Sequence, residues 1–185
     1  MKNFFLLILT VLILASCGSD SLSNSKAEDI ITDCLVAKPE QRTTSFRIGR
    51  ATFTKQDYDQ ELLQKYLKLA DEDYLEMELV KEITKGWQKG SKEYSIKLTE
   101  KSLEFMEEVP EKNGNATAKT FHYEVGEVLE VHETPATNTA EVKVNFKAVN
   151  ITPFALLSRK DPTEFWVQKL KFSKTSNGWK YCDNF

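Results

Sequence analysis

Two histidines and the carboxylates near them are the residues whose types could bind a metal. His122 lies close to Glu124, and His132 lies between Glu130 and Glu133. On one straight strand both histidines would share a face with two of these glutamates, and imidazole with carboxylate is a ligand set that zinc accepts. Residues ten positions apart on a strand are, however, roughly 33 Å apart. The spacing therefore favours a solvated strand face, and no metal or other cofactor is predicted.

The common catalytic motifs are not found in this sequence. It contains no G-x-S-x-G, no H-E-x-x-H, no Gly-rich phosphate loop and no paired C-x-x-C. Isolated acids such as Asp161 and Glu164 can be catalytic in principle, but isolated acids on a charged surface usually are not. We therefore predict that the protein is not an enzyme. A cleft that holds a carboxylate of raised pKa would change that interpretation.

Cys17 is preceded by the features of an export signal. Phe4 to Leu14 is an eleven-residue run whose only polar member is Thr10, and one lysine precedes it. The run is too short to span a bilayer and is typical of the apolar region of a signal peptide. Leu14-Ala15-Ser16-Cys17 then resembles the signal of bacterial lipoproteins. The resemblance implies cleavage before Cys17 and acylation of both its sulfur and its new amino group.

This resemblance makes residues 1–16 a signal peptide and residues 17–24 a lipidated cysteine with a tether. The lipid bilayer is then a partner through acylated Cys17, and several acyl chains, at roughly 0.8 kcal/mol per buried methylene, make the anchoring permanent. Gly18 and Ser19 stand where an Asp would favour inner-membrane retention in enteric bacteria, which indicates the outer membrane and leaves the leaflet open. Asp20-Ser21-Leu22 also resembles the O-glycosylation site of Bacteroidetes lipoproteins. The alternative is an ordinary secretory signal followed by a chance cysteine.

Two further cysteines, Cys34 and Cys182, remain near the ends of the exported chain. In an oxidising envelope such a pair suggests a disulfide, which in the chain-entropy model contributes about 4 to 5 kcal/mol. Two separate buried thiols are the alternative, because cysteine is also a common core residue.

Trp87 is the residue that we expect to make a contact with a partner. It lies in Lys85-Gly86-Trp87-Gln88-Lys89-Gly90, where glycines and lysines leave little around a large amphipathic ring to bury it. Exposed tryptophan is a frequent anchor of protein interfaces. Trp87 with Lys85 and Lys89 is therefore the predicted interaction site, with an envelope protein as the partner. The alternative is that the indole ring folds back onto its own sheet.

The charge is uneven along the chain. Without residues 1–16 the chain carries 24 basic and 28 acidic residues, a net charge of about −4. Nine acids stand against three lysines from Asp57 to Glu82, and eight bases against two acids from Lys143 to Lys180. Four lysines lie opposite apolar strand positions and so share an exposed sheet face: Lys143, Lys147, Lys169 and Lys171. This face could bind anionic lipid or an acidic polymer. The alternatives are that it is only solvated, or that it balances the charge of the acidic half of the chain.

Residues 25–110 read as a helical section with a hairpin. Periodicity predicts a helix over 26–37, a strand from Phe46 that bends at Gly49, and a second helix after Thr54. The apolar stripe expected on the second helix comprises Tyr58, Leu62, Leu63, Tyr66, Leu67 and Ala70. Alternating residues on either side of a turn between Gly86 and Gly90 predict the hairpin.

The hairpin and the short helix expected after it resemble the wing and following helix of winged-helix proteins. The resemblance covers about fifty residues and is carried by Tyr94–Phe105 (YSIKLTEKSLEF), which contains the second hairpin strand and that helix. The sequence departs from that family at Asp73 and Ser102, where glycine is usual. DNA binding, the family's commonest role, needs a basic face. This stretch is acidic and is expected outside the cytoplasm, so no nucleic acid is predicted as a partner. The resemblance still implies a platform for protein interaction.

Residues 118–185 read as four antiparallel strands in a meander. Strands are expected from Phe121, from Ala140 and from Phe165, and Asn177-Gly178 predicts a hairpin turn into the last one. The predicted fold class is therefore α+β: N-terminal helices with a wing-like β-hairpin, then a four-stranded antiparallel β-meander. Whether this makes one domain or two stays open.

These expectations combine into a membrane-anchored envelope lipoprotein that acts as a non-catalytic interaction or assembly module. The alternative is a small-ligand-binding protein, because a meander packed on a long helix also resembles the cystatin and nuclear-transport-factor folds, which have a concave pocket. A filled core with an exposed aromatic tip would favour the first function. A large apolar cavity with converging polar groups would favour the second.

Overall fold

The structure, a computed structural model, describes residues 21–111 and 113–182. The predicted signal peptide and Cys17 lie outside the described residues. Within those two ranges, no helix has the length and apolar character needed to cross a membrane.

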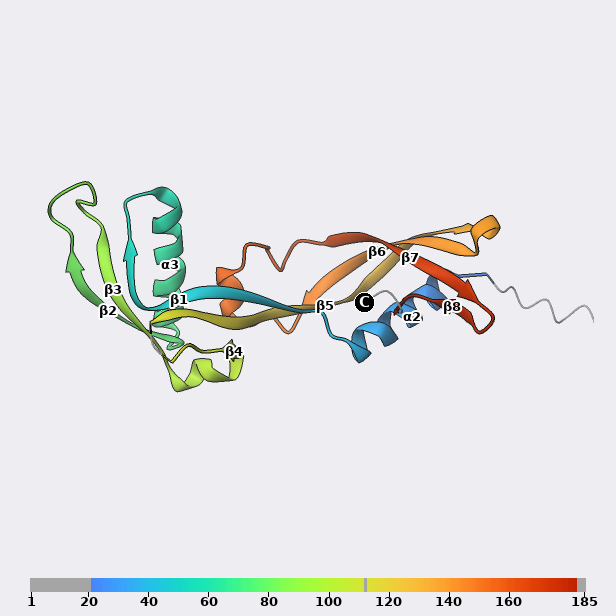
Figure 1. Ribbon diagram of the computed structural model, residues 1–185, viewed down its shortest axis with the longest axis horizontal. Helices are drawn as coiled ribbons and strands as arrows, with labels where there is room; N and C mark the ends of the chain where they lie inside the picture. The colour runs from blue at the N-terminus through green and yellow to red at the C-terminus, as the bar shows by residue number, and fades with distance from the viewer. Residues whose placement is uncertain (1–20, 112, 183–185) are drawn as a thin grey trace, which may run out of the picture. The chain divides into compact units, whose positions relative to one another are not determined.

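Strands account for most of the regular structure (Figure 1). The elements follow one another as α2 (Asn24–Ala37), β1 (Gln41–Phe53), α3 (Asp57–Asp71), β2 (Leu75–Glu82), β3 (Lys92–Leu98), the 3-10 helix η2 (Glu100–Phe105), β4 (Met106–Glu108), β5 (Gly114–Thr134), the 3-10 helix η3 (Pro135–Thr137), β6 (Thr139–Val149), the 3-10 helix η4 (Pro153–Leu157), β7 (Trp166–Thr175) and β8 (Gly178–Lys180).

The predicted fold class is wrong, because one large sheet dominates the molecule. Its eight strands are ordered β2-β3-β1-β5-β6-β7-β8, with β4 paired to β5 off this path. The expected hairpin and meander strands exist, but β1 joins them: it pairs with β5 over 41–48 and with β3 over 49–53. Side-chain alternation predicts which residues form a strand but not which distant strand lies beside it. A separate meander is wrong because β5, its first strand, also pairs with β1.

Gly49 is the point where β1 changes its partner. Its φ of +79° is a conformation that glycine adopts readily and other residues rarely do. A Cβ atom at this position would also collide with the side chain of Asn113. The bend predicted at Gly49 therefore coincides with the place where β1 leaves β5 and meets β3.

Two compact units make up the chain, and each combines segments that are distant in sequence. The first unit contains the described residues up to Ala37 together with Val125–Asn145 and the residues from Val167 onward, and the second unit contains Lys38–Glu124 and Phe146–Trp166. The division expected from the sequence, into 25–110 and 118–185, does not follow these boundaries. The long strands β5, β6 and β7 each contribute residues to both units.

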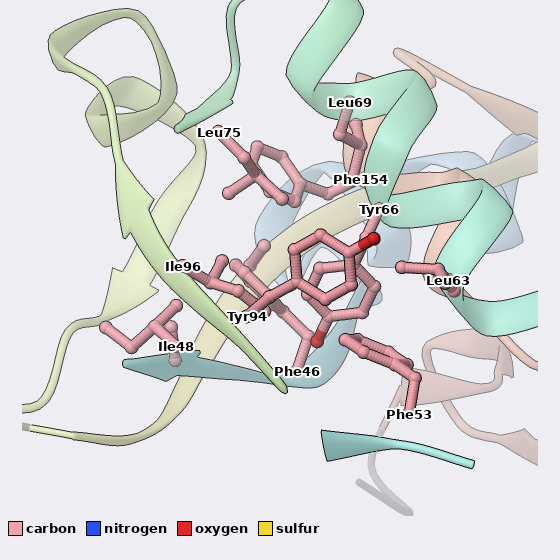
Figure 2. Close-up of a cluster of buried hydrophobic side chains, with 12 residues drawn as sticks. Phe46, Ile48, Phe53, Leu63, Tyr66, Leu69, Leu75, Tyr94, Ile96 and Phe154 are labelled. Atoms are coloured by element: carbon pink, nitrogen blue, oxygen red, sulfur yellow. The ribbon is translucent and has the colours of Figure 1, made fainter. Parts of the chain in front are cut away.

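An aromatic cluster forms the core of the second unit (Figure 2). Tyr66 of α3 packs edge-on against Phe53 of β1, with ring centroids 5.5 Å apart, and Phe46 packs on Phe154 at 5.1 Å. The stripe predicted on α3 is buried only in part. Leu63 and Tyr66 enter this cluster, whereas Tyr58 and Leu62 on the flank of the helix are exposed.

Tyr66 gives the folded state a specific dependence on alkaline pH. Its hydroxyl accepts a hydrogen bond from Arg47 N–H (2.8 Å) and donates one to Arg47 C=O (3.1 Å). Burial raises the pKa of Tyr66 to about 12, against the opposing effects of the Arg47 hydrogen bond and charge. Between pH 10 and 12 the unfolded chain loses a phenolic proton that the folded chain retains. The free energy of unfolding therefore falls, by about 2 to 3 kcal/mol at pH 12.

We expect the Tyr66→Phe variant to lose this part of the pH dependence. It is less stable than the wild type at pH 9, because the two Arg47 backbone groups lose their partner, but the difference shrinks toward pH 12. Urea titrations at pH 9, 10, 11 and 12 measure this. A constant difference between the two proteins would contradict the assignment.

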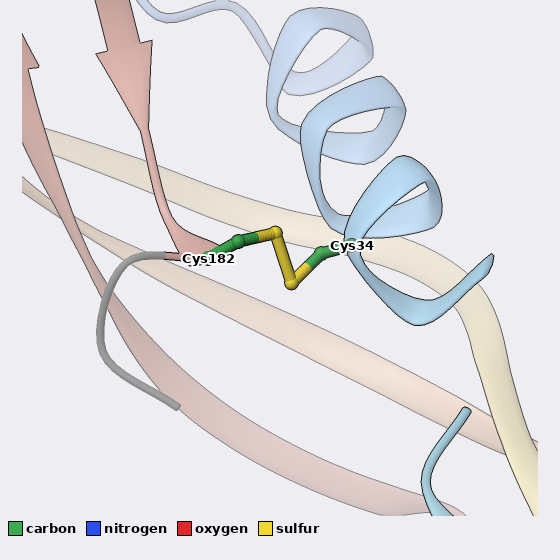
Figure 3. The surroundings of a disulfide bond; sticks show 2 residues. All are labelled: Cys34 and Cys182. Carbon is green, nitrogen blue, oxygen red and sulfur yellow. A yellow bond between two sulfur atoms is a disulfide. The ribbon is translucent and has the colours of Figure 1, made fainter. Parts of the chain in front are cut away.

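The first unit is held together by α2 and a disulfide (Figure 3). Ala27, Ile31 and Cys34 are buried on one face of α2, which is the helix predicted over 26–37. Cys34 is bonded to Cys182, which follows β8, and their Cα atoms are 5.6 Å apart. Of the two alternatives that the sequence left open for these cysteines, the structure contains the bridge.

Candidate functional site

The connection between β2 and β3 is a closed turn. Ile83 N–H donates to Ser91 C=O (2.9 Å) and Gly90 N–H donates to Ile83 C=O (2.6 Å), which close the end of the hairpin. Within the loop, Lys89 N–H donates to Gly86 C=O (3.1 Å). Both glycines have positive φ values, 78° and 86°, which a residue with a side chain rarely adopts. The loop backbone is therefore well defined.

Trp87 stands at the centre of this turn and is 90 % exposed, more than any other large apolar side chain that the structure describes. Lys85 and Lys89 flank it and are exposed as well. We call residues 85–89 the Trp87 tip. The indole ring does not fold back onto its own sheet, so the tip presents an exposed apolar ring with an exposed lysine two positions away on either side in the sequence.

The stem of the hairpin is fixed while the tip projects. Leu75 of β2 and Tyr94 and Ile96 of β3 are buried in the core of the second unit. Along the stem, the Glu93 carboxylate pairs with Lys81 (3.2 Å) and with Arg50 (3.5 Å). The Trp87 tip is thus an exposed aromatic residue on a hairpin whose stem is anchored in the core.

An open cleft of about 850 Å³ lies elsewhere in the second unit, between β1, α3 and the segment that follows η4. Four cationic side chains line it, and Glu61 is the one carboxylate among its lining residues. The cations are Arg42, Lys65, Arg159 and Lys160. The hydroxyl of Thr44 donates to Leu157 C=O (3.2 Å), which ties the end of η4 to β1.

Arg42 is held in place by two aromatic rings beside this cleft. Its guanidinium carbon lies 5.3 Å from the ring centre of Tyr123 and 5.1 Å from that of Trp166, and its terminal nitrogen pairs with Glu40. The ammonium group of Lys160 lies 4.8 Å from the same Trp166 ring. Burial raises the pKa of Tyr123, and the Arg42 charge opposes that rise.

The cleft has no counterpart among the site residues predicted from the sequence. Arg42 and Lys160 lie in opposite halves of the chain, and only the fold brings both to Trp166. The one available signal was the pair Tyr58 and Leu62, apolar residues on the flank of α3 that line the cleft instead of entering the core.

His122 and Asp161, two of the candidate residues named from the sequence, contact different neighbours in the structure. His122 Nε2 is 3.9 Å from the Glu124 carboxylate and 3.5 Å from the Asn150 amide. In the part of the chain that the structure describes, no three His, Cys, Asp or Glu side chains are grouped for a metal. The Thr163 hydroxyl and backbone N–H donate to Asp161, which lowers the pKa of that carboxyl.

The four lysines expected on one sheet face belong to different units. Lys147 lies in the second unit, 3.9 Å from the Glu124 carboxylate. The other three lie in the first unit, where Lys169 donates to Glu141 at 2.7 Å. This hydrogen bond lowers the pKa of Glu141 and raises the pKa of Lys169. Two of the four lysines are thus engaged by neighbouring carboxylates.

Comparisons with protein-family models, with curated proteins and with solved structures found no match. The hairpin expected as a wing is present as β2 and β3, but the segment after it is the short 3-10 helix η2. The likeness of Leu14–Cys17 to lipoprotein signals and that of the hairpin segment to winged-helix proteins both stay predictions.

Proposed function

We propose that the protein is a lipid-anchored lipoprotein of the bacterial outer membrane and acts as a non-catalytic interaction module through the Trp87 tip. The observation that carries the proposal is the 90 % exposure of Trp87 on a turn closed by backbone hydrogen bonds. The Leu14-Ala15-Ser16-Cys17 pattern supports the anchor, with Cys17 as the acylated residue. The buried aromatic cluster of the second unit supports it further, because it gives the hairpin a packed core to be anchored in.

The chemistry of the tip defines the partner that fits it. A tryptophan buries roughly 150 to 250 Å² when a partner covers it, and such rings are frequent energetic centres of interfaces. A turn that is already ordered loses little conformational freedom on binding. Lys85 and Lys89 favour a partner whose apolar pocket is bordered by carboxylates. The proposed partner is therefore an envelope protein with an acidic rim around an apolar pocket.

We expect Trp87→Ala to leave folding intact and to weaken the complex. Because the ring is exposed, thermal stability changes by no more than about 0.5 kcal/mol. Loss of an interface anchor costs at least about 2 kcal/mol, which is roughly a thirtyfold loss of affinity. Native gel electrophoresis of membranes in mild detergent measures the effect: the wild type migrates in a complex, and the variant migrates as the free chain.

Phe165→Ala is the matched control, because Phe165 is a large aromatic residue that is 77 % exposed elsewhere in the second unit. The control keeps the complex. Equal migration of the Trp87→Ala variant and the wild type would refute the proposed contact. A large loss of thermal stability in Trp87→Ala would instead place the ring in the core.

A further inference from the structure

The cleft between β1, α3 and the segment after η4 carries an excess of positive charge. Four cations and one carboxylate line it, so its lining has a formal charge of +3, in a chain whose net charge is −3. Lys65 and Arg42 are half-buried, while Arg159 and Lys160 are exposed. A concave site with one sign of charge concentrates ligands of the opposite sign.

Two of these cations contact the same indole ring. Arg42 and Lys160 both lie about 5 Å from the centre of Trp166. The ring attracts each cation, and the Glu40 carboxylate pairs with one terminal nitrogen of Arg42. The buried Nε of Arg42 also makes no hydrogen bond in the structure. An oxyanion beside Arg42 would give this Nε–H the acceptor that it lacks and would add a second anionic partner to the one supplied by Glu40.

The remaining lining is suited to a ligand that carries hydroxyl groups and a ring. Thr43, Ser45 and Ser158 contribute hydroxyls, and the Glu61 carboxylate can accept hydrogen bonds from a ligand but would repel a simple polyanion. Tyr58 is 64 % exposed and offers a ring face next to Leu62. The volume of about 850 Å³ lies within the range of small-ligand sites, about 300 to 1,000 Å³.

We propose that this cleft binds an acidic saccharide, a hydroxyl-rich ligand that carries a carboxylate, sulfate or phosphate group. Arg42 and Lys160 bind the oxyanion, and Arg159 and Lys65 add positive charge. The Glu61 carboxylate and the side-chain hydroxyls of the lining form hydrogen bonds with the hydroxyl groups of the sugar. Tyr58 packs against a sugar ring. This binding is separate from the contact made by the Trp87 tip.

Calorimetric titration of the lipidated full chain in zwitterionic nanodiscs tests the proposal. The probes are trigalacturonate, sulfated galactotriose, phosphorylated galactotriose and neutral galactotriose, all at 150 mM salt. We expect one saturable site for at least one of the charged probes and at least tenfold weaker binding of the neutral one. The rank order of the three charged probes identifies which oxyanion the site prefers.

Exposed residues provide variants that do not disturb the core. Arg159→Gln and Lys160→Gln are each expected to weaken the charged probe about tenfold, the effect of one charge-assisted contact. Tyr58→Ala also lowers the affinity for the charged probe, whereas Tyr58→Phe, which keeps the ring, retains the affinity of the wild type. Lys68→Gln, on an exposed face of the same helix and outside the cleft lining, leaves affinity unchanged.

Three results would overturn the proposal. The first is that no charged probe binds the wild type. The second is that neutral galactotriose binds as tightly as the charged probes. The third is a combination of two observations: a polyglutamate peptide displaces the charged probe as well as unlabelled probe does, and Tyr58→Ala does not change the affinity. Together they would show that the cleft is a general polyanion surface.

Discussion

Phe154→Ala is expected to lower the free energy of unfolding by about 3 to 5 kcal/mol, and the melting temperature by roughly 10 °C. Phe154 is fully buried, and its ring centre lies 5.1 Å from that of Phe46, 6.1 Å from that of Tyr74 and 6.2 Å from that of Phe105. Removing the ring leaves a cavity that these neighbours cannot fill. It also loosens η4 and with it the segment that lines the cleft.

Thermal and urea unfolding of Phe154→Ala measure this loss. Ile151→Ala is the control in the same loop, because Ile151 is 51 % exposed and its truncation changes stability by no more than about 0.5 kcal/mol. A loss below about 1 kcal/mol for Phe154→Ala would show that η4 does not pack into the core of the second unit as described.

Loss of the Cys34–Cys182 bond is the second large effect. The bond joins residues 148 positions apart, and a closure of that length stabilises the folded state by about 4 to 5 kcal/mol in the chain-entropy model. Because both cysteines belong to the first unit, the fluorescence of the buried Trp179 in that unit should report the loss.

Urea titrations with and without a reductant test this effect. The wild type shifts to lower urea when reduced, and the double variant Cys34→Ala/Cys182→Ala matches the reduced wild type and does not respond to the reductant. Two labelled thiols per denatured, unreduced chain, in addition to any at Cys17, would contradict the bond.

Local sequence patterns predicted individual elements better than their arrangement. The helix at 26–37, the bend at Gly49 and the turn at Asn177-Gly178 each depend on neighbouring residues, and the structure has α2, the change of partner in β1 and the β7–β8 hairpin there. The eight-stranded sheet depends instead on β1 pairing with β3 and β5, which are distant in sequence. No local pattern specifies that pairing.

The two candidate sites differ in the same way: one depends on neighbouring residues and the other on distant ones. Trp87 could be predicted to be exposed because its own turn contains glycines and lysines in place of apolar neighbours. The cleft could not be predicted, since Arg42 and Lys160 meet at Trp166 only after the sheet has formed. Helical periodicity also cannot show which flank of an apolar stripe stays uncovered, which is why Tyr58 was expected in the core.

In-cell photo-crosslinking from an aromatic probe at position 87, with the lipid anchor intact, tests the central claim most directly. A second probe at Phe165 serves as the control position. We predict a discrete protein adduct from position 87, none from position 165, and a weaker adduct when Lys85→Glu and Lys89→Glu reverse the flanking charges. The absence of an adduct from a folded, correctly localised chain, or equal adducts from both positions, would contradict the assignment of the Trp87 tip as the contact surface.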